Sequence, residues 1–130
     1  MNAAPLDELR RDVALANRIL ERLGLSHAFG HASARVPGTN TFLLPTRRSP
    51  GLAEADNLLV LDTEGRIVSG EGEPNSEFWI HARLYAARTD VGGVVHAHPP
   101  ACRSTGASGS SARASWATSW LRRWDRATRP

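Results

Sequence analysis

Two histidines one residue apart, His96 and His98, carry the strongest chemical signal in this sequence of 130 residues. The surrounding segment 91–98 has the composition of a strand, and residues two apart in a strand project from the same face. Two imidazoles on one face can bind one divalent metal, with zinc–nitrogen distances of about 2.0–2.1 Å. The pattern is short, so two hydrogen-bonded or solvent-facing histidines at a strand end are the alternative interpretation.

A carboxylate and a third histidine precede this pair. Glu77 lies 19 residues before His96. A carboxylate close to a bound metal serves as a ligand or a general base, whereas a carboxylate at the start of a helix can simply favour the helix dipole. We interpret His81, one helical turn after Glu77, as a structural or hydrogen-bonding histidine.

Segment 30–35, which reads GHASAR, combines backbone donors, a hydroxyl and a guanidinium at the turn into a predicted strand. This combination suits an anionic group, although an ordinary strand entry can have the same residues. Arg47 and Arg48 lie in a predicted loop, where most such pairs are only solvated. Cys102 has no visible base or metal partner, and we expect it to be inert.

The composition excludes several kinds of function. Hydrophobic residues make up 41% of the chain and charged residues 22%, which is typical of a globular protein. No apolar run approaches the ~18 residues that a membrane span needs, and the N-terminus does not read as a secretory signal. All 16 Lys and Arg positions are arginine, which excludes Schiff-base chemistry on a lysine of this chain. One cysteine excludes an internal disulfide and favours a cytoplasmic location.

Charge and composition divide the chain at residue 103. Residues 1–102 carry 10 Arg against 12 acidic residues, or −2, whereas residues 103–130 carry six Arg against one Asp, or +5. The body is mildly acidic, so we expect no nucleic-acid binding. The Ser-, Arg- and Trp-rich segment 103–130 has few core-forming residues. We expect it to be frameshifted or disordered, and a helix lying on a membrane surface is the alternative.

The hydrophobic pattern predicts a helix, two hairpins, a second helix and a strand. The first helix covers residues 5–23, the hairpin strands are 31–35 with 41–44 and 57–62 with 66–69, and Gly65 takes a left-handed conformation. Asn75 or Ser76 is predicted to cap the second helix, which ends near Arg88. The helical spacing places Ile80, Leu84 and Ala87 on one face of this helix, and it places Glu77, His81 and Tyr85 on a neighbouring face. This order favours an α/β fold with much antiparallel pairing.

Over residues 5–102, the sequence resembles the N-terminal portion of the class II aldolase/adducin family. The motifs that carry the resemblance are GHASAR, FLLPT, LLVLDTEGRIVSGEGEPNSE, FWIHARLYAARTDV and VVHAHPP, in that family's order and spacing. The resemblance implies an α/β fold with a central, mostly antiparallel sheet flanked by helices, truncated here at the C-terminus.

The resemblance also implies roles for individual residues. His96 and His98 would bind zinc or another divalent metal such as Mn²⁺, and Glu77 would be the catalytic acid/base. The substrate-binding positions would be Gly30, His31, Ser33, Arg47, Asn75 and Ser76.

The implied function is a metal-dependent carbon–carbon lyase, an aldolase or a decarboxylase, that works through a metal-stabilised enediolate. The small-molecule substrate would be a sugar phosphate or a hydroxy or keto carboxylate, and full-length members would be homo-oligomers. His31 replaces the asparagine of the aldolases, and Arg47 follows Pro45-Thr46, so the sequence is closer to the GHxSxR, decarboxylase-like members. Arg47 then favours a carboxylate.

The family's third histidine ligand lies well downstream, and no histidine follows His98 here. We therefore expect this truncated chain to be inactive. A non-catalytic, adducin-like member or remnant is the alternative.

Overall fold

The computed structural model describes residues 3–26 and 29–99. These residues form helix α1 (Ala3–Arg22), strands β1 (His31–Arg35) and β2 (Thr41–Pro45), a short 3-10 helix η1 (Pro50–Leu52), strands β3 (Leu58–Asp62) and β4 (Ile67–Ser69), helix α2 (Phe78–Ala87) and strand β5 (Gly93–His96). Segment 103–130 and Cys102, for which the sequence makes predictions, lie outside the described residues. Neither described helix is long and apolar enough to cross a membrane.

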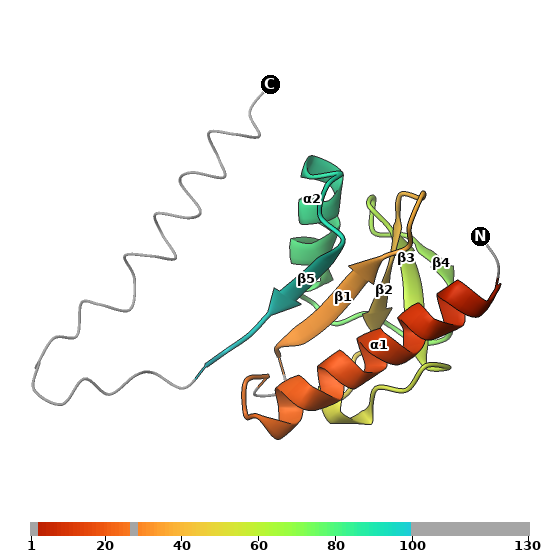
Figure 1. Ribbon diagram of the computed structural model, residues 1–130. Coiled ribbons are helices and arrows are strands. Elements are labelled where there is room, and N and C mark those ends of the chain that lie inside the picture. The colour runs from red at the N-terminus through yellow and green to blue at the C-terminus, as the bar shows by residue number, and fades with distance from the viewer. Residues whose placement is uncertain (1–2, 27–28, 100–130) are drawn as a thin grey trace, which may run out of the picture. The chain divides into compact units, whose positions relative to one another are not determined.

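The five strands form one antiparallel sheet in the order β4-β3-β2-β1-β5. The last strand in the chain therefore pairs with the first, and β5 lies beside β1 (Figure 1). The start of β1, the end of β2 and the end of β5 lie together at one end of the strands, where His31 pairs with His96. We call this strand end of the sheet the His31 edge. The turn between β3 and β4, residues 62–66, lies at the opposite end of the strands and is called the Asp62 turn.

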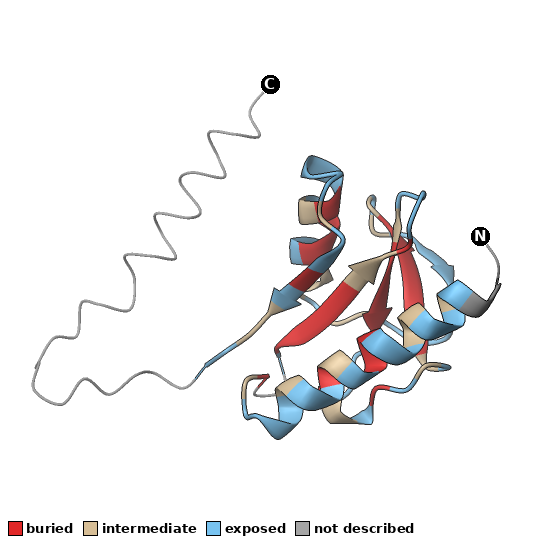
Figure 2. Cartoon of the chain, viewed as in Figure 1, coloured by how far each residue is buried: buried red, intermediate tan, exposed pale blue. Residues whose placement is uncertain are grey.

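One helix covers each face of the sheet (Figure 1). Alternate strand residues point to opposite faces, which gives two apolar layers. The layer under α1 contains Val13, Ala14, Val36, Leu43, Ala53, Leu58 and Val60. The layer under α2 contains Phe42, Leu44, Leu59, Leu61, Ala82, Tyr85 and Val94. Figure 2 shows that burial is concentrated in the central strands, as their continuous apolar sequences require.

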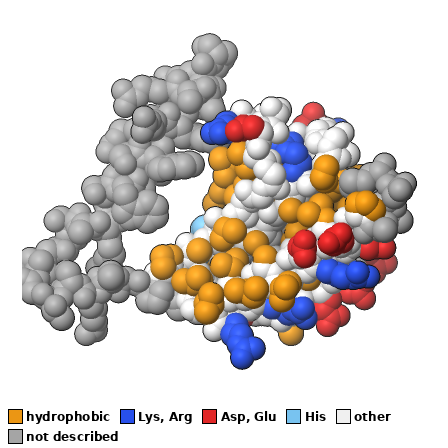
Figure 3. All heavy atoms as spheres, viewed as in Figure 1, with side chains coloured by type: hydrophobic (Ala, Val, Ile, Leu, Met, Phe, Trp, Pro, Cys, Tyr) orange, Lys and Arg blue, Asp and Glu red, His pale blue; other side chains and the backbone are white. Residues whose placement is uncertain are grey.

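A buried asparagine joins α1 to the sheet. Asn17 Nδ2 donates to the carbonyl oxygen of Ala32 at 2.9 Å, and the Ala32 N–H donates to Asn17 Oδ1 at 2.9 Å. Asn17 therefore satisfies strand backbone groups that β2 does not pair, since the paired residues of β1 and β2 begin at Ala34. The outer face of α1 keeps the exposed apolar side chains Leu15 and Ile19, Leu23 directly after the helix is also exposed, and Figure 3 shows apolar atoms gathered over this helix.

The predicted α/β architecture and the order of elements are confirmed, and Gly65 has a positive φ of 87°. Two details were wrong. Helix α2 begins at Phe78, later than expected, and neither Asn75 nor Ser76 caps it. Strand β5 ends at His96 rather than His98. Of the two predicted faces of α2, the one with His81 and Tyr85 is buried, whereas Ile80 is exposed.

Candidate functional site

Three side chains from three different elements meet at the His31 edge. His31 is the first residue of β1, His96 is the last residue of β5, and Glu77 directly precedes α2. A nitrogen or oxygen atom from each lies within 4.8 Å of the other two. We call this set the His31–Glu77–His96 cluster. The cluster contains Glu77 and His96, which the sequence predicts as the acid/base and a metal ligand. It also contains His31, which was expected to contact substrate rather than metal.

The backbone positions each member of the cluster. The antiparallel register of β1 and β5 sets His31 opposite His96. The segment before α2 is held against the end of β2, where Thr46 bridges to Pro74 and the Arg47 N–H donates to the Glu73 carbonyl at 2.7 Å. The Glu77 N–H then donates to Asn75 Oδ1 at 3.0 Å. Asn75 thus shapes the turn that presents Glu77.

Gly30 permits the close approach of β1 and β5 at this edge. A Cβ atom at this position would lie 2.7 Å from Ser26 Cα and 2.8 Å from the His96 carbonyl oxygen. Both are backbone atoms that cannot give way without moving the strands. The glycine of the GHASAR motif is therefore required by packing beside the cluster.

The cluster and the adjacent His81 contain buried polar atoms that lack hydrogen-bond partners among the described residues. They are His31 Nε2, Glu77 Oε2, His81 Nε2 and His96 Nδ1. Glu77 Oε2 and His96 Nδ1 are 3.2 Å apart, but they are not aligned as a hydrogen bond. Buried polar atoms are normally paired because an unpaired one costs about 1–3 kcal/mol. Four together indicate a place where a ligand supplies the missing partner.

Burial keeps the histidines of the cluster neutral. It lowers the pKa of His31, and the hydrogen bond to the Phe29 carbonyl offsets only part of this effect. Burial also lowers the pKa of His96, against the opposing charge of Glu77. The pKa of His81 falls to about 3 for the same reason. Neutral imidazole is the form that binds metal ions.

Behind the cluster, a buried hydrogen-bonded network fills the space between β1 and α2. Ser33 Oγ lies 2.5 Å from His81 Nδ1 and 2.8 Å from the Tyr85 hydroxyl oxygen. The His81 ring stacks on His31, with centroids 4.4 Å apart. Ser33 was expected to contact substrate, but the structure places it in this network. These contacts agree with the role predicted for His81, that of a structural or hydrogen-bonding histidine.

Beside the cluster lies a pocket of about 250 Å³. Its lining includes five of the six predicted substrate-binding residues: Gly30, His31, Arg47, Asn75 and Ser76. Residues 47, 75 and 76 are far from His31 in sequence, and the end of β2 brings them together. The lining offers two guanidiniums, those of Arg47 and Arg48, and several neutral polar groups next to His31.

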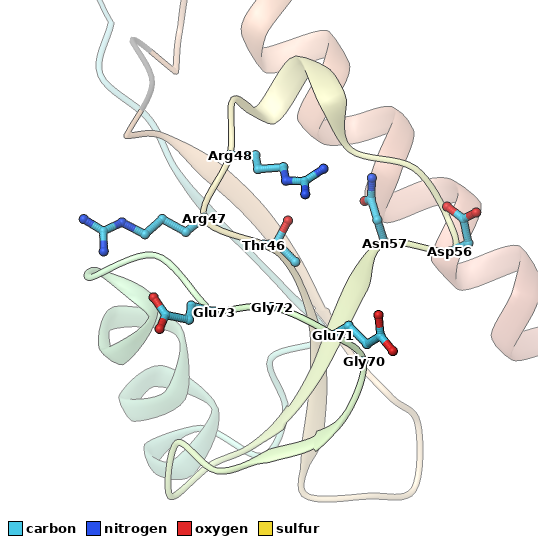
Figure 4. Close-up of a pocket in the computed structure, with 9 residues that line it drawn as sticks. All are labelled: Thr46, Arg47, Arg48, Asp56, Asn57, Gly70, Glu71, Gly72 and Glu73. Carbon is cyan, nitrogen blue, oxygen red and sulfur yellow. The ribbon is translucent and has the colours of Figure 1, made fainter.

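A larger pocket of about 530 Å³ shares Thr46, Arg47 and Arg48 with the first one. Its other charged lining residues are Asp56, Glu71 and Glu73. Figure 4 shows the Arg48 side chain directed toward Asn57 inside this larger pocket, whereas Arg47 points away from it. The larger pocket has no histidine, so we place the candidate site in the smaller one.

His98 is close to His96 but outside the three-residue cluster. Its ring centroid lies 4.6 Å from that of His96, and its backbone N–H donates to the Leu25 carbonyl at 2.6 Å. The side chain is exposed and follows the end of β5. A ligand role for His98 stays a prediction.

A protein-family model and a curated protein each match more than two thirds of this chain. The family model described as the class II aldolase and adducin N-terminal domain matches residues 11–116. The chain is 36% identical to a 3,4-dihydroxyphthalate decarboxylase from Arthrobacter keyseri, over 70% of this chain and 40% of the relative. It thus spans about two fifths of the length of that curated relative. The family match continues beyond residue 102, where the sequence predicts the domain to end.

Two solved structures have the same fold. An aldolase II superfamily protein from Pseudomonas syringae is 32% identical, with a TM-score of 0.66 over 72% of this chain and 39% of that one. An L-fuculose 1-phosphate aldolase from Glaciozyma antarctica is 24% identical, with a TM-score of 0.68 over 77% of this chain and 45% of that one.

Proposed function

The chain belongs to the class II aldolase and adducin family, and we propose that it forms part of a divalent-metal-dependent carbon–carbon lyase. Decarboxylation of a hydroxy or keto carboxylate is the reaction we favour over aldol cleavage of a sugar phosphate. The observation that carries the proposal is the convergence of His31 Nε2, Glu77 Oε2 and His96 Nδ1, buried and without partners. Imidazole nitrogens and a carboxylate oxygen are the donor set that zinc prefers.

The residues present are compatible with a divalent metal. His96 and His98 are the ligands that the family resemblance implies, with rings 4.6 Å apart. When bound, a divalent cation stabilises negative charge that develops on substrate oxygens. We propose zinc, with Mn²⁺ as the other candidate.

The position of Glu77 supports a role in moving a proton. Its Oε2 atom has no hydrogen-bond partner among the described residues, and its side chain is partly exposed next to the pocket-lining residues Asn75 and Ser76. Because a carboxylate has two oxygen atoms, one can bind the metal while the other accepts a proton from substrate and returns it. The role we propose for Glu77 is therefore the acid/base.

Arg47 is placed to select a carboxylate. It lines the smaller pocket with His31 and makes no ion pair within the described part of the chain. A guanidinium binds a planar carboxylate through two parallel hydrogen bonds. A curated relative that acts on a dihydroxyphthalate supports the same substrate class.

The remaining parts of the proposal concern the protein as a whole. We propose a cytoplasmic location from the single cysteine, and a homo-oligomeric full-length form from the family resemblance. No histidine follows His98 in this sequence. Because the third histidine ligand that the family resemblance implies is absent from these 130 residues, we propose that this chain binds substrate without turning it over.

The test is a calorimetric comparison of two ligands on the zinc-loaded chain. We expect 3,4-dihydroxyphthalate to bind at least tenfold more tightly than L-fuculose 1-phosphate. Arg47→Ala should remove that preference, since a charge-assisted pair is worth about 1.5–3 kcal/mol. Arg48→Ala is the matched control: Arg48 also lines the smaller pocket, but its side chain is directed into the larger one, so its loss should change the preference little.

Each other outcome has a definite meaning. Tighter binding of the sugar phosphate would favour aldol cleavage. Release of carbon dioxide that Glu77→Gln abolishes would establish the lyase and contradict the inactivity of this chain. Binding of neither ligand would contradict the lyase and favour a non-catalytic, adducin-like member.

A further inference from the structure

We infer that His31 is itself a metal ligand, binding through Nε2 together with Glu77 and His96, rather than only a substrate contact. The inference deepens the proposed function, because it concerns the same metal site. It does not depend on catalysis, since metal binding can be measured without turnover. The family resemblance implies no such role for His31, because aldolases of the family have asparagine there.

The tautomer of His31 follows from one hydrogen bond. Its Nδ1 atom lies 2.9 Å from the carbonyl oxygen of Phe29. A carbonyl oxygen only accepts, so Nδ1 carries the hydrogen and donates it. Nε2 of the neutral ring then presents a lone pair. Metal-binding histidines are commonly held in this way, with one ring nitrogen bonded to a backbone carbonyl and the other on the metal.

The lone pair of His31 is directed into a group of other acceptors. His31 is 1% exposed, and one of its ring nitrogens lies within 4.8 Å of ligand atoms of both Glu77 and His96. No described residue donates a hydrogen bond to His31 Nε2 or Glu77 Oε2. Placing lone pairs together in a buried site is unfavourable unless a cation lies between them. A divalent metal supplies that cation.

The surroundings fix the His31 ring in this orientation. The ring stacks on His81, with centroids 4.4 Å apart, and packs edge to face with His96, whose centroid is 5.6 Å away at an interplanar angle of 75°. His81 is in turn held through Nδ1 by Ser33. A buried ring with two aromatic neighbours and one hydrogen-bonded nitrogen has little freedom to turn Nε2 elsewhere. This immobility is what a preorganised ligand requires.

The test is a cobalt titration of the purified chain after removal of bound metal. Cobalt(II) replaces zinc and reports its ligands through visible absorption. We expect His31→Asn, which installs the residue found in the aldolases, to weaken cobalt binding at least tenfold and to change the absorption bands. Ser49→Ala is the matched control, because Ser49 lines the same pocket without belonging to the cluster. It should leave both unchanged.

A second measurement avoids any substitution. In ¹⁵N-labelled wild-type chain, adding zinc should shift the Nε2 resonance of His31 while Nδ1 stays protonated. This result is expected even if His31→Asn fails to fold.

The outcomes separate this inference from the proposed function. Unchanged affinity and spectrum in His31→Asn, with loss of binding in His98→Gln, would overturn the inference and assign the metal to the predicted pair. Metal binding that depends on His31, without binding of either substrate probe, would support the inference and contradict the lyase. Failure of the wild-type chain to bind cobalt or zinc would overturn both.

Discussion

Within the described residues, buried polar groups have hydrogen-bond partners at the Asp62 turn but lack them at the His31 edge, at the other end of the strands. At the Asp62 turn, the carboxylate accepts hydrogen bonds from the backbone N–H groups of Glu64 and Arg66 at 3.0 and 2.9 Å, and from Arg66 Nε at 2.8 Å. At the His31 edge, a nitrogen or oxygen of each cluster residue has no partner. Both regions lie at strand ends of the same antiparallel sheet.

This contrast separates structural from functional polar residues. A polar side chain that completes a turn is satisfied within the chain, and its value appears as stability. Polar side chains that converge without partners reduce stability, and folded proteins retain them where a ligand completes the set. The Asp62 turn should therefore respond to pH and to mutation, whereas the His31 edge should respond to metal.

The largest expected effect is stabilisation by zinc at the His31 edge. A metal that binds only the folded chain should add about 2.7 kcal/mol to the free energy of unfolding at a hundredfold excess over its Kd. For a domain of this size, that corresponds to a rise in Tm of roughly 10–20 °C. Thermal melts with zinc and with a chelator measure the difference.

Two variants make this result specific to one edge. His96→Ala should lose the zinc-dependent rise in Tm, because it removes one member of the cluster. Asp62→Asn should keep the full rise, because it lies at the other edge. Equal zinc responses in these two variants would break the proposed contrast.

The next effect concerns the network behind the cluster. Ser33→Ala removes the shared partner of His81 Nδ1 and the Tyr85 hydroxyl, both of which are buried. Leaving buried polar atoms unpaired should lower the free energy of unfolding by about 1–3 kcal/mol. Urea unfolding of the metal-free chain measures this loss. Tyr85→Phe is the control, since it removes one hydroxyl and leaves Ser33 paired with His81, and it should cost less. A Ser33→Ala variant as stable as wild type would show that the network is not structural.

Much of this fold could be predicted from sequence because its signals are local. The apolar runs of β2 and β3, the three-four spacing of α1 and the glycine of the Asp62 turn each act within a few residues. The family motifs also predicted Glu77 and His96, which the fold brings together, and five of the residues that line the smaller pocket.

What sequence reasoning missed depends on contacts between distant segments. Ser33 and Tyr85 meet only because β1 packs against α2, so the hydroxyl of the GHASAR motif seemed free for substrate. Asn17 was not singled out from the sequence, because its pairing with Ala32 requires the packing of α1 on the sheet. His31 joins Glu77 and His96 through the pairing of the first and last strands. The alternation of His31, Ser33 and Arg35 was the one available signal that these side chains share a face.

The smallest expected effect tests the Asp62 turn through its pH dependence. Hydrogen bonds from the Arg66 backbone N–H and guanidinium hold the pKa of the Asp62 carboxyl below its ordinary value of 3.8. Its contribution to stability is therefore complete above pH 3.8 and is lost as the pH falls through the lower pKa of the folded state. In Asp62→Asn the amide is neutral at every pH, and its NH₂ group cannot accept from Arg66. We expect this variant to melt below wild type at pH 7, with the difference shrinking as the pH falls below 3.8. Glu64→Gln is the matched control, because Glu64 also contacts Arg66, at 2.7 Å, but is exposed. An exposed ion pair adds little to stability, so its Tm should stay close to that of wild type at all pH values. A difference between Asp62→Asn and wild type that persists unchanged at about pH 2, below the ordinary carboxyl range, would mean that the turn depends on the shape of the side chain rather than on its charge.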